Sequence, residues 1–323
     1  MTNQNLQPDP ALVERFAQDL DQLVERDSRI GIAVSGGPDS MALLLLAAAA
    51  RPGLTEAATV DHALRPESRG EAEMVAGICG RLGMPHAILT VEWTKKPTSA
   101  IQERARDARY GLLGRWLRDR GLDALATAHH ADDQAETLLM RLSRGSGVRG
   151  LSAMRPWAVV PGTNLPLARP LLGWRRSELL AVCAAAGVEP IADPSNRDEQ
   201  FERVRIRGAL QATGWLDPQA LARSAANLAS ADEALDWVAE GLALARVTDD
   251  AEALRVDAHG LPSELRRRLL RIAFARFHAP EPRGAELSRA LEALEDGRTV
   301  TLSGLKLEGG SPWRVSAEPP RKR

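Results

Sequence analysis

The stretch IAVSGGPDSMALLLL, residues 32–46, places six small or polar residues between two apolar runs. The run that leads into it, Ile30 to Val34, is short and rich in β-branched residues, which predicts a buried strand. The run that follows, from Met41 onward, is rich in Ala and Leu and predicts a helix. The segment SGGPDS between them is therefore expected to form a tight turn from a strand into a helix.

The residues of this turn suit an anion. Gly36 and Gly37 allow backbone conformations and close approaches that a Cβ atom would block. Ser35, Ser40 and the free N–H groups at the helix start are expected to point into one small space, which is typical of a phosphate site. An ordinary strand-to-helix turn with a good N-cap is the plainer interpretation. A Walker loop and a Rossmann fingerprint are both excluded, because neither Gly-Lys-Ser/Thr nor G-x-G-x-x-G is present.

Strands and helices alternate around this turn. Strands are expected at 30–34, 57–60, 86–91 and 124–128, with helices at 9–26, 41–50, 67–82, 100–120 and 132–142. This alternation predicts an α/β fold with a parallel, doubly wound sheet whose ligand lies at the carboxyl ends of the strands. The turn SGGPDS, the pair Asp61-His62 and the pair His129-His130 all fall at those ends.

The pattern changes after Leu142. Further helices are expected at 174–186, 201–212, 219–244, 265–276 and 286–295, a turn at 193–197, and a small β-hairpin over the final segment TVTLSGLKLEGGSPWRV. We therefore expect one domain over residues 1–216 and a smaller, mostly helical domain over residues 217–323.

The composition places the chain among cytoplasmic proteins with a well-developed core. Its 323 residues contain no run of about 18 apolar residues, and its polar N-terminus lacks a signal-peptide pattern. Cys79 and Cys183 lie far apart, each in a helical pattern, so they are expected to be buried thiols and not a disulfide.

The net charge of −1 hides a basic stretch. Between Arg141 and Arg176 the chain has seven arginines and no acid, which is typical of phosphate binding, although a solvated loop is the plainer interpretation. The later segment DPSNRDEQFERVRIR, residues 193–207, carries three arginines at alternate positions, and arginine forks suit phosphate or ribose contacts.

The segment HHADDQAET, residues 129–137, crowds three acids and two histidines at one helix start. His129, Asp133 and Glu136 are spaced by four and three residues, so they are expected to share one helix face. His130 and Asp133, three residues apart, could face each other too. Acids in a first turn also suit the helix dipole, which is the structural explanation. Zinc is disfavoured because no cysteine or third histidine lies nearby, and the carboxylates could instead hold a cation or an ammonium group.

The segment QERARDARY, residues 102–110, places Glu103, Arg106 and Tyr110 at helical spacing, with Arg109 one turn after Arg106. Surface pairs between neighbouring turns would explain the same pattern.

Taken in order, these motifs resemble those of the tRNA(Ile)-lysidine synthetase family, within the PP-loop N-type ATP pyrophosphatases. The resemblance covers about residues 30–210 and rests on SGGPDS, VDHALRPESRGEA, QERARDARY, HHADDQAET, RGSGVRGLSAM, RPLL and DPSNRDEQFERVRIR. It implies a carbon–nitrogen ligase that uses ATP and Mg²⁺. In that reaction ATP adenylates the 2-carbonyl oxygen of the wobble cytidine in tRNA(Ile) with a CAU anticodon, pyrophosphate leaves, and the ε-amine of free L-lysine then displaces AMP.

The resemblance also implies roles for individual residues. The ATP loop is expected to consist of Ser35, Gly36, Gly37, Pro38, Asp39 and Ser40, with Asp39 holding Mg²⁺ directly or through water. Arg106 and Arg109 are candidates for stabilising developing negative charge. Asp133 and Glu136 suit the ammonium of lysine, with His129 as a helper. Candidate tRNA contacts are Arg144, Arg149, Arg203, Arg205 and Arg207, with further contacts expected from the C-terminal domain.

Two alternatives remain at this stage. A tRNA thiolase of the same superfamily would use paired cysteines to carry sulfur or an iron–sulfur cluster, but Cys79 and Cys183 form no CxxC. A non-catalytic tRNA-binding protein should have lost its acids, but Asp39, Asp133 and Glu136 are all present.

Overall fold

The computed structural model describes residues 6–65, 67–94, 99–191 and 202–318. The chain forms two compact units: residues 1–145 with 150–226, and residues 146–149 with 227–323. The expected turn at 193–197 lies outside the described residues. Within the described ranges, no helix combines the length and apolar character needed to cross a membrane.

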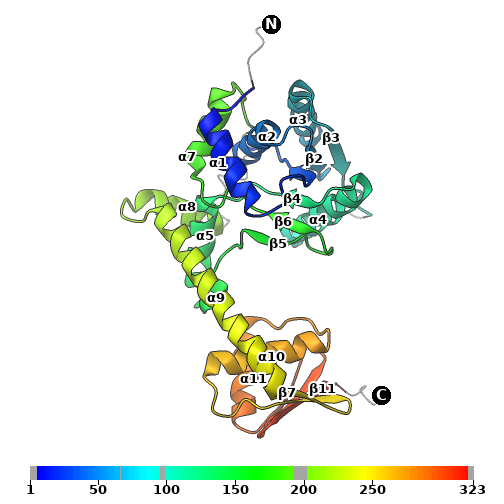
Figure 1. Cartoon of the computed structure of the whole chain (residues 1–323), viewed down its shortest axis with the longest axis vertical. Coiled ribbons are helices and arrows are strands. Elements are labelled where there is room, and N and C mark those ends of the chain that lie inside the picture. Colours follow the sequence, from blue (N-terminus) through cyan, green and yellow to red (C-terminus); the bar gives the residue numbers. More distant parts are fainter. Residues whose placement is uncertain (1–5, 66, 95–98, 192–201, 319–323) are drawn as a thin grey trace. The chain divides into compact units, whose positions relative to one another are not determined.

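The first unit is built on a six-stranded sheet in the order β3-β2-β1-β4-β6-β5 (Figure 1). Its strands are β1 (Ile30–Ala33), β2 (Thr55–Asp61), β3 (His86–Thr90), β4 (Ala124–Ala126), β5 (Trp157–Val159) and β6 (Pro166–Ala168). All neighbours are parallel except β5, which pairs antiparallel with β6. The expected parallel sheet is confirmed, and the crossover between β1 and β4 brings the ends of these two distant strands side by side.

The helices of this unit follow the expected order. They are α1 (Pro10–Asp21), α2 (Pro38–Ala50), α3 (Ser68–Leu82), α4 (Ile101–Arg120), α5 (Ala131–Leu142), α7 (Arg176–Ala185) and α8 (Glu202–Ala212), while α6 (Val148–Leu151) and α9 (Pro218–Arg246) each run across the boundary between the units. Helix α2 lies against α1 and α7, as Figure 1 shows. Its residues from Ser40 to Ala47 are all buried, as expected for a helix that is apolar on every side.

Two apolar clusters cover the sheet of the first unit. One joins α1, α2, α3 and α7 to the side chains of Ile30 and Ile32. The other joins Tyr110, Leu113 and Leu117 of α4 to residues of β4 and β6. Helices therefore cover both faces, which leaves the carboxyl ends of the strands as the place where polar side chains gather.

The second unit contains more sheet than the sequence indicates. Five antiparallel strands run in the order β7-β8-β11-β10-β9, where only a terminal hairpin was expected. They are β7 (Val247–Asp250), β8 (Ala253–Val256), β9 (Thr299–Leu302), β10 (Leu305–Glu308) and β11 (Trp313–Ala317), and α10 (Ser263–Arg276) and α11 (Gly284–Glu295) pack on them around a shared apolar core. The acidic segment Val247 to Val256 is too polar and too short to predict strands by itself.

Candidate active site

The loop between β1 and α2 is folded by its own hydrogen bonds. Ser40 Oγ accepts a hydrogen bond from the backbone N–H of Ser35 at 3.1 Å and donates one to the carbonyl of Gly37 at 2.9 Å. The hydroxyl oxygens of Ser35 and Ser40 lie 3.1 Å apart, so the two serines do converge. Among the described residues, no side chain caps the N-terminus of α2. Its first-turn N–H groups therefore suit an anion such as phosphate.

Gly36 is required by the shape of this loop. Its φ is +84°, in the left-handed region, and a Cβ built there would lie 2.4 Å from Ile191 Cδ1. The backbone of Ile191 also donates a hydrogen bond to the carbonyl of Gly36 at 2.9 Å. The left-handed backbone thus favours glycine at position 36, and a side chain there would have to displace the end of Ile191.

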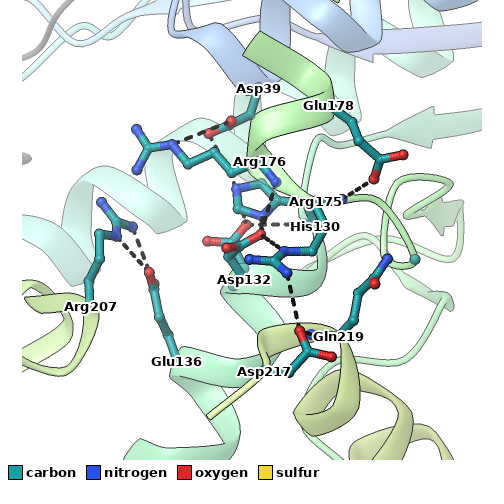
Figure 2. A network of polar contacts seen from close by, with 12 residues as sticks. Asp39, His130, Asp132, Glu136, Arg175, Arg176, Glu178, Arg207, Asp217 and Gln219 are labelled. Atoms are coloured by element: carbon teal, nitrogen blue, oxygen red, sulfur yellow. Dashed lines mark hydrogen bonds and ion pairs between the residues drawn. The ribbon is translucent and has the colours of Figure 1, made fainter. Parts of the chain in front are cut away.

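A buried histidine connects this loop to the start of α5, as Figure 2 shows. His130 Nε2 lies 3.5 Å from Asp39 Oδ2 and 3.5 Å from Asp133 Oδ2, and Nδ1 lies 3.6 Å from Asp132 Oδ2. Burial lowers the pKa of His130, but Asp132, Asp39 and Asp133 outweigh it and raise this pKa to about 10. His130 is therefore a cation at neutral pH, and it holds three carboxylates of two different helices together.

The same cluster includes the start of α7. Asp132 accepts a hydrogen bond from the backbone N–H of Arg176 at 2.9 Å and lies 3.4 Å from Arg175 Nε. Burial alone would raise the pKa of Asp132, but His130, this N–H and Arg175 hold it well below its ordinary value. None of Asp132, His130, Arg175 and Arg176 was among the expected site residues. The doublet His129-His130 was the available signal, but the sequence does not say which histidine faces the acids.

Asp39 fits the expected magnesium ligand. Its Oδ1 is buried and accepts no hydrogen bond from the described residues; Arg176 Nε lies 4.0 Å away. Within the described ranges, no three acidic, histidine or cysteine side chains form a metal-binding group. Mg²⁺ is commonly held by one or two carboxylates together with substrate phosphates and water, so a carboxylate oxygen that accepts no hydrogen bond beside a phosphate loop is a suitable donor.

His129 differs from its neighbour in place and in charge. It precedes α5, so the expectation that it shares a helix face with Asp133 and Glu136 is wrong; the helix begins only at Ala131, after the N-cap His130. His129 Nδ1 lies 3.0 Å from Thr127 Oγ1. Burial lowers the pKa of His129 to about 4, with Asp133 opposing the shift and nearby arginines adding to it. His129 is therefore neutral at pH 7.

Glu136 is the most buried acid of the expected lysine site. It is 1% exposed, and Arg207 of α8 binds both of its oxygens, at 2.6 and 3.2 Å. Arg203 Nε lies 3.1 Å from Oε2. The structure thus brings a candidate lysine ligand together with two candidate tRNA contacts. An ammonium could reach Glu136 only if one of these arginines moved.

Arg106 and Arg109 lie on α4 beside Tyr110. Their guanidinium carbons are 5.0 and 5.1 Å from the centre of the Tyr110 ring. Arg109 is near enough to lower the pKa values of both His62, which is lowered mainly by burial, and His129. The positive charge of Arg109 on α4 therefore acts on His62, which follows β2, and on His129, which follows β4.

The remaining candidate tRNA contacts make ion pairs of their own. Arg144 pairs with Glu202 in the first unit, and Arg149, which belongs to the second unit, lies 2.8 Å from Asp236. Both arginines therefore pair with acids that lie outside the stretch 141–176, which contains no acid of its own.

Both cysteines are buried and free. Burial raises the pKa of Cys79 to about 12 and that of Cys183 to about 11. Buried thiols of this kind are poor nucleophiles and poor cluster ligands, so the structure does not favour the thiolase alternative.

Comparison with known proteins agrees with this geometry. The PP-loop domain family matches residues 11–213. A tRNA(Ile)-lysidine synthase of Novosphingobium aromaticivorans is 46% identical, over 94% of this chain and 93% of its own length. The synthase of Zymomonas mobilis subsp. mobilis is 43% identical, over 91% of this chain and 90% of its own length.

Among solved structures, the U34-tRNA thiolase NcsA from Methanococcus maripaludis, with its 4Fe–4S cluster, resembles this chain with a TM-score of 0.56 at 15% identity. The match covers 68% of this chain and 80% of the thiolase, and at that identity it shows a shared fold alone. The much closer sequence relatives decide the family. The chain belongs to the tRNA(Ile)-lysidine synthase family of PP-loop proteins.

Proposed function

We propose that this protein joins free L-lysine to C2 of the wobble cytidine of tRNA(Ile) with a CAU anticodon, in the cytoplasm, at the expense of ATP. The observation that carries this proposal is the link between Asp39 and Asp133 through His130. It brings the start of α2, which we assign to phosphate, close to the acidic start of α5. A phosphate and an ammonium group could therefore be held side by side.

In the first step, O2 of cytidine attacks the α-phosphorus of ATP, and the bond to the β-phosphate oxygen breaks to release pyrophosphate. The loop residues Ser35 to Ser40 and the N–H groups of α2 bind the departing phosphates. Asp39 would hold Mg²⁺, which neutralises phosphate charge when bound. Arg106 and Arg109 supply positive charge where negative charge develops.

In the second step, the ε-amine of lysine attacks C2, and the bond from C2 to the adenylated oxygen breaks to release AMP. Asp133 is the carboxylate that we assign to the ammonium group, because both oxygens of Glu136 are taken by arginines. The attacking amine must first lose a proton. That proton passes to water, because burial holds the pKa of His129 at about 4 and leaves it a weak base. Neutral His129, within electrostatic reach of Asp133, is assigned only a helping role as a hydrogen-bond partner of the amine.

Pyrophosphate release tests the ATP-site assignment. We expect release by the wild-type protein to require the tRNA, and we expect Asp39→Asn to reduce its rate by at least about a hundredfold, as for loss of a group that acts on transition-state charge. Asp107→Asn, an exposed acid of α4, is the matched control and should release pyrophosphate at the wild-type rate. A wild-type rate in Asp39→Asn would refute the assignment.

A further inference from the structure

Arg169 is a buried arginine that the assigned steps do not use. It comes directly after β6 and is only 8% exposed. Its backbone N–H donates to the carbonyl of Pro156 at 2.8 Å, and its NH1 group donates to the carbonyl of Arg155 at 2.7 Å. The guanidinium is therefore held in place by neutral backbone groups.

No acid of the described residues forms an ion pair with Arg169, and its buried Nε finds no hydrogen-bond partner there. Burial lowers the pKa of Arg169, Tyr110 opposes this shift, and Arg106 adds to it. A buried charge without a counter-charge is costly, so such groups are rare unless something outside the chain pairs with them. This position is in that respect unlike Arg207, whose charge Glu136 neutralises.

The neighbours of Arg169 are also hydrogen-bond donors or cations. The N–H of Thr127 donates to the carbonyl of Ala168 at 3.1 Å, so the end of β6 lies beside the segment that carries His129. Arg169 contributes to the lowered pKa of His129, as does Arg109. The hydroxyl of Tyr110 is buried and, among the described residues, has no partner.

We propose that Arg169 is a substrate-binding residue that holds a phosphate group, in a subsite shared with Arg106, Arg109 and Tyr110. This subsite lies at the ends of β4 and β6, whereas the pyrophosphate cradle lies at the end of β1. A planar guanidinium with an unused Nε can donate to two phosphate oxygens at once, which an ammonium group cannot do in the same geometry.

The inference rests on the proposed function for the source of the phosphate. That reaction supplies two: the α-phosphate that becomes AMP, and the phosphodiester next to the wobble cytidine. Both present the same oxyanion chemistry to Arg169, and binding experiments with and without RNA distinguish them.

The test compares Arg169→Met with the wild-type protein in three measurements. These are the affinity for α,β-methylene-ATP without RNA, the affinity for tRNA(Ile) at several salt concentrations, and the thermal midpoint of the ligand-free protein. Arg115→Met serves as the control, because Arg115 is an exposed arginine of α4, the helix that carries Arg106 and Arg109. We expect at least about a tenfold loss of affinity for one ligand in Arg169→Met and none in the control.

The two affinities show which phosphate, if any, Arg169 binds. Weaker nucleotide binding identifies the α-phosphate, and weaker tRNA binding with a salt slope lower by about one unit identifies the phosphodiester. A ligand-free thermal midpoint close to that of the wild type supports the inference further, since the change removes an unpaired buried charge. Wild-type affinity for both ligands would overturn it.

Replacement variants and an activity assay distinguish a failure of the phosphate subsite from misfolding and from a failure of the proposed function. If Arg169→Met does not fold, Arg169→Lys and Arg169→Gln replace it, and wild-type affinities in both would overturn the inference. Lysine incorporation by the wild-type protein is measured alongside. Its absence would refute the proposed function, whereas intact incorporation with unchanged binding in the Arg169 variants would refute only the phosphate subsite.

Discussion

Two adjacent histidines differ in charge at neutral pH: His130 is a cation and His129 is neutral. His130 lies among three aspartates and keeps its proton, whereas His129 stays neutral because it is buried and lies near Arg169 and Arg109. The sequence shows the doublet but not the full surroundings of each ring, because Asp39, Arg109 and Arg169 approach from α2, α4 and the end of β6. The two charge states thus depend on burial and on groups from distant elements as well as on the neighbouring Asp132 and Asp133.

The raised pKa of His130 predicts a slope in stability on the alkaline side. Its pKa is about 10 in the folded chain and near 6.5 when unfolded. The unfolded chain therefore binds fewer protons between these values, and stability falls as pH rises. We expect the free energy of unfolding to fall by up to about 1.4 kcal/mol per pH unit between about pH 7 and pH 9.

Urea unfolding at several pH values measures this slope, and His130→Gln should abolish it. His129→Gln should keep it, because His129 is neutral in both states above about pH 7. A slope that persists unchanged in His130→Gln would show that other groups cause it.

Replacing the two loop glycines by alanine is predicted to change the free energy of unfolding by different amounts. Gly36→Ala forces a side chain into the left-handed region and against Ile191, so we expect a loss of about 1–2 kcal/mol in the free energy of unfolding. A Cβ at Gly37 meets only Ser35 Oγ, at 3.7 Å, so Gly37→Ala should change stability by less than about 0.5 kcal/mol.

Nucleotide affinity shows whether the loop around Gly37 binds phosphate, independently of any change in stability. The added methyl of Gly37→Ala stands in the space beside Ser35 that we assign to phosphate, so affinity for α,β-methylene-ATP should fall although the protein stays folded. Isothermal titration of this variant measures the effect, and wild-type affinity would argue against a phosphate in the loop.

At the scale of elements, α8 presents two different faces. Arg203 and Arg207 are one helical turn apart and bind Glu136 of α5, whereas Arg205 lies on the other side of the axis and is exposed. The alternate spacing of these arginines shows that they spread around a helix. It cannot show that one face would meet a buried carboxylate of another element.

Because the two faces of α8 differ, we expect Arg207→Ala to lower stability and Arg205→Ala to weaken tRNA binding. Arg207→Ala leaves the buried Glu136 with one partner fewer and should lower the free energy of unfolding by about 2 kcal/mol. Arg205→Ala should leave stability within about 0.5 kcal/mol but flatten the salt dependence of tRNA binding by about one unit. Denaturant unfolding and salt titrations of both variants check this, and equal salt slopes in wild type and Arg205→Ala would remove Arg205 from the RNA surface.

In the whole molecule, segments with a clear apolar pattern were predictable, whereas β5 and β6 were not. The helices and the first four parallel strands follow from apolar patterning, as in the run from Met41 to Leu46. Strands β5 and β6 have three residues each, and β6 begins with a proline, so pattern alone does not reveal them. The ion pairs that occupy Glu136 and Arg149 join residues distant in sequence, which spacing cannot foresee.

The two units divide the candidate residues between them. Arg149 belongs to the second unit with the antiparallel sheet, whereas the phosphate loop, the acids of α5 and the arginines of α4 and α8 belong to the first. All the groups to which we assign chemistry therefore lie in the unit that contains the parallel sheet. The family membership and this concentration of polar groups lead to the same reaction.

The mass of the wobble nucleoside shows whether this protein joins lysine to cytidine. The purified protein is incubated with ATP, L-lysine and unmodified tRNA(Ile) with a CAU anticodon, and the digested nucleosides are analysed by mass spectrometry. We predict that the wobble cytidine gains the mass of lysine less one water, and that this requires ATP, lysine and a cytidine at that position. An unchanged cytidine despite full consumption of ATP would contradict this assignment.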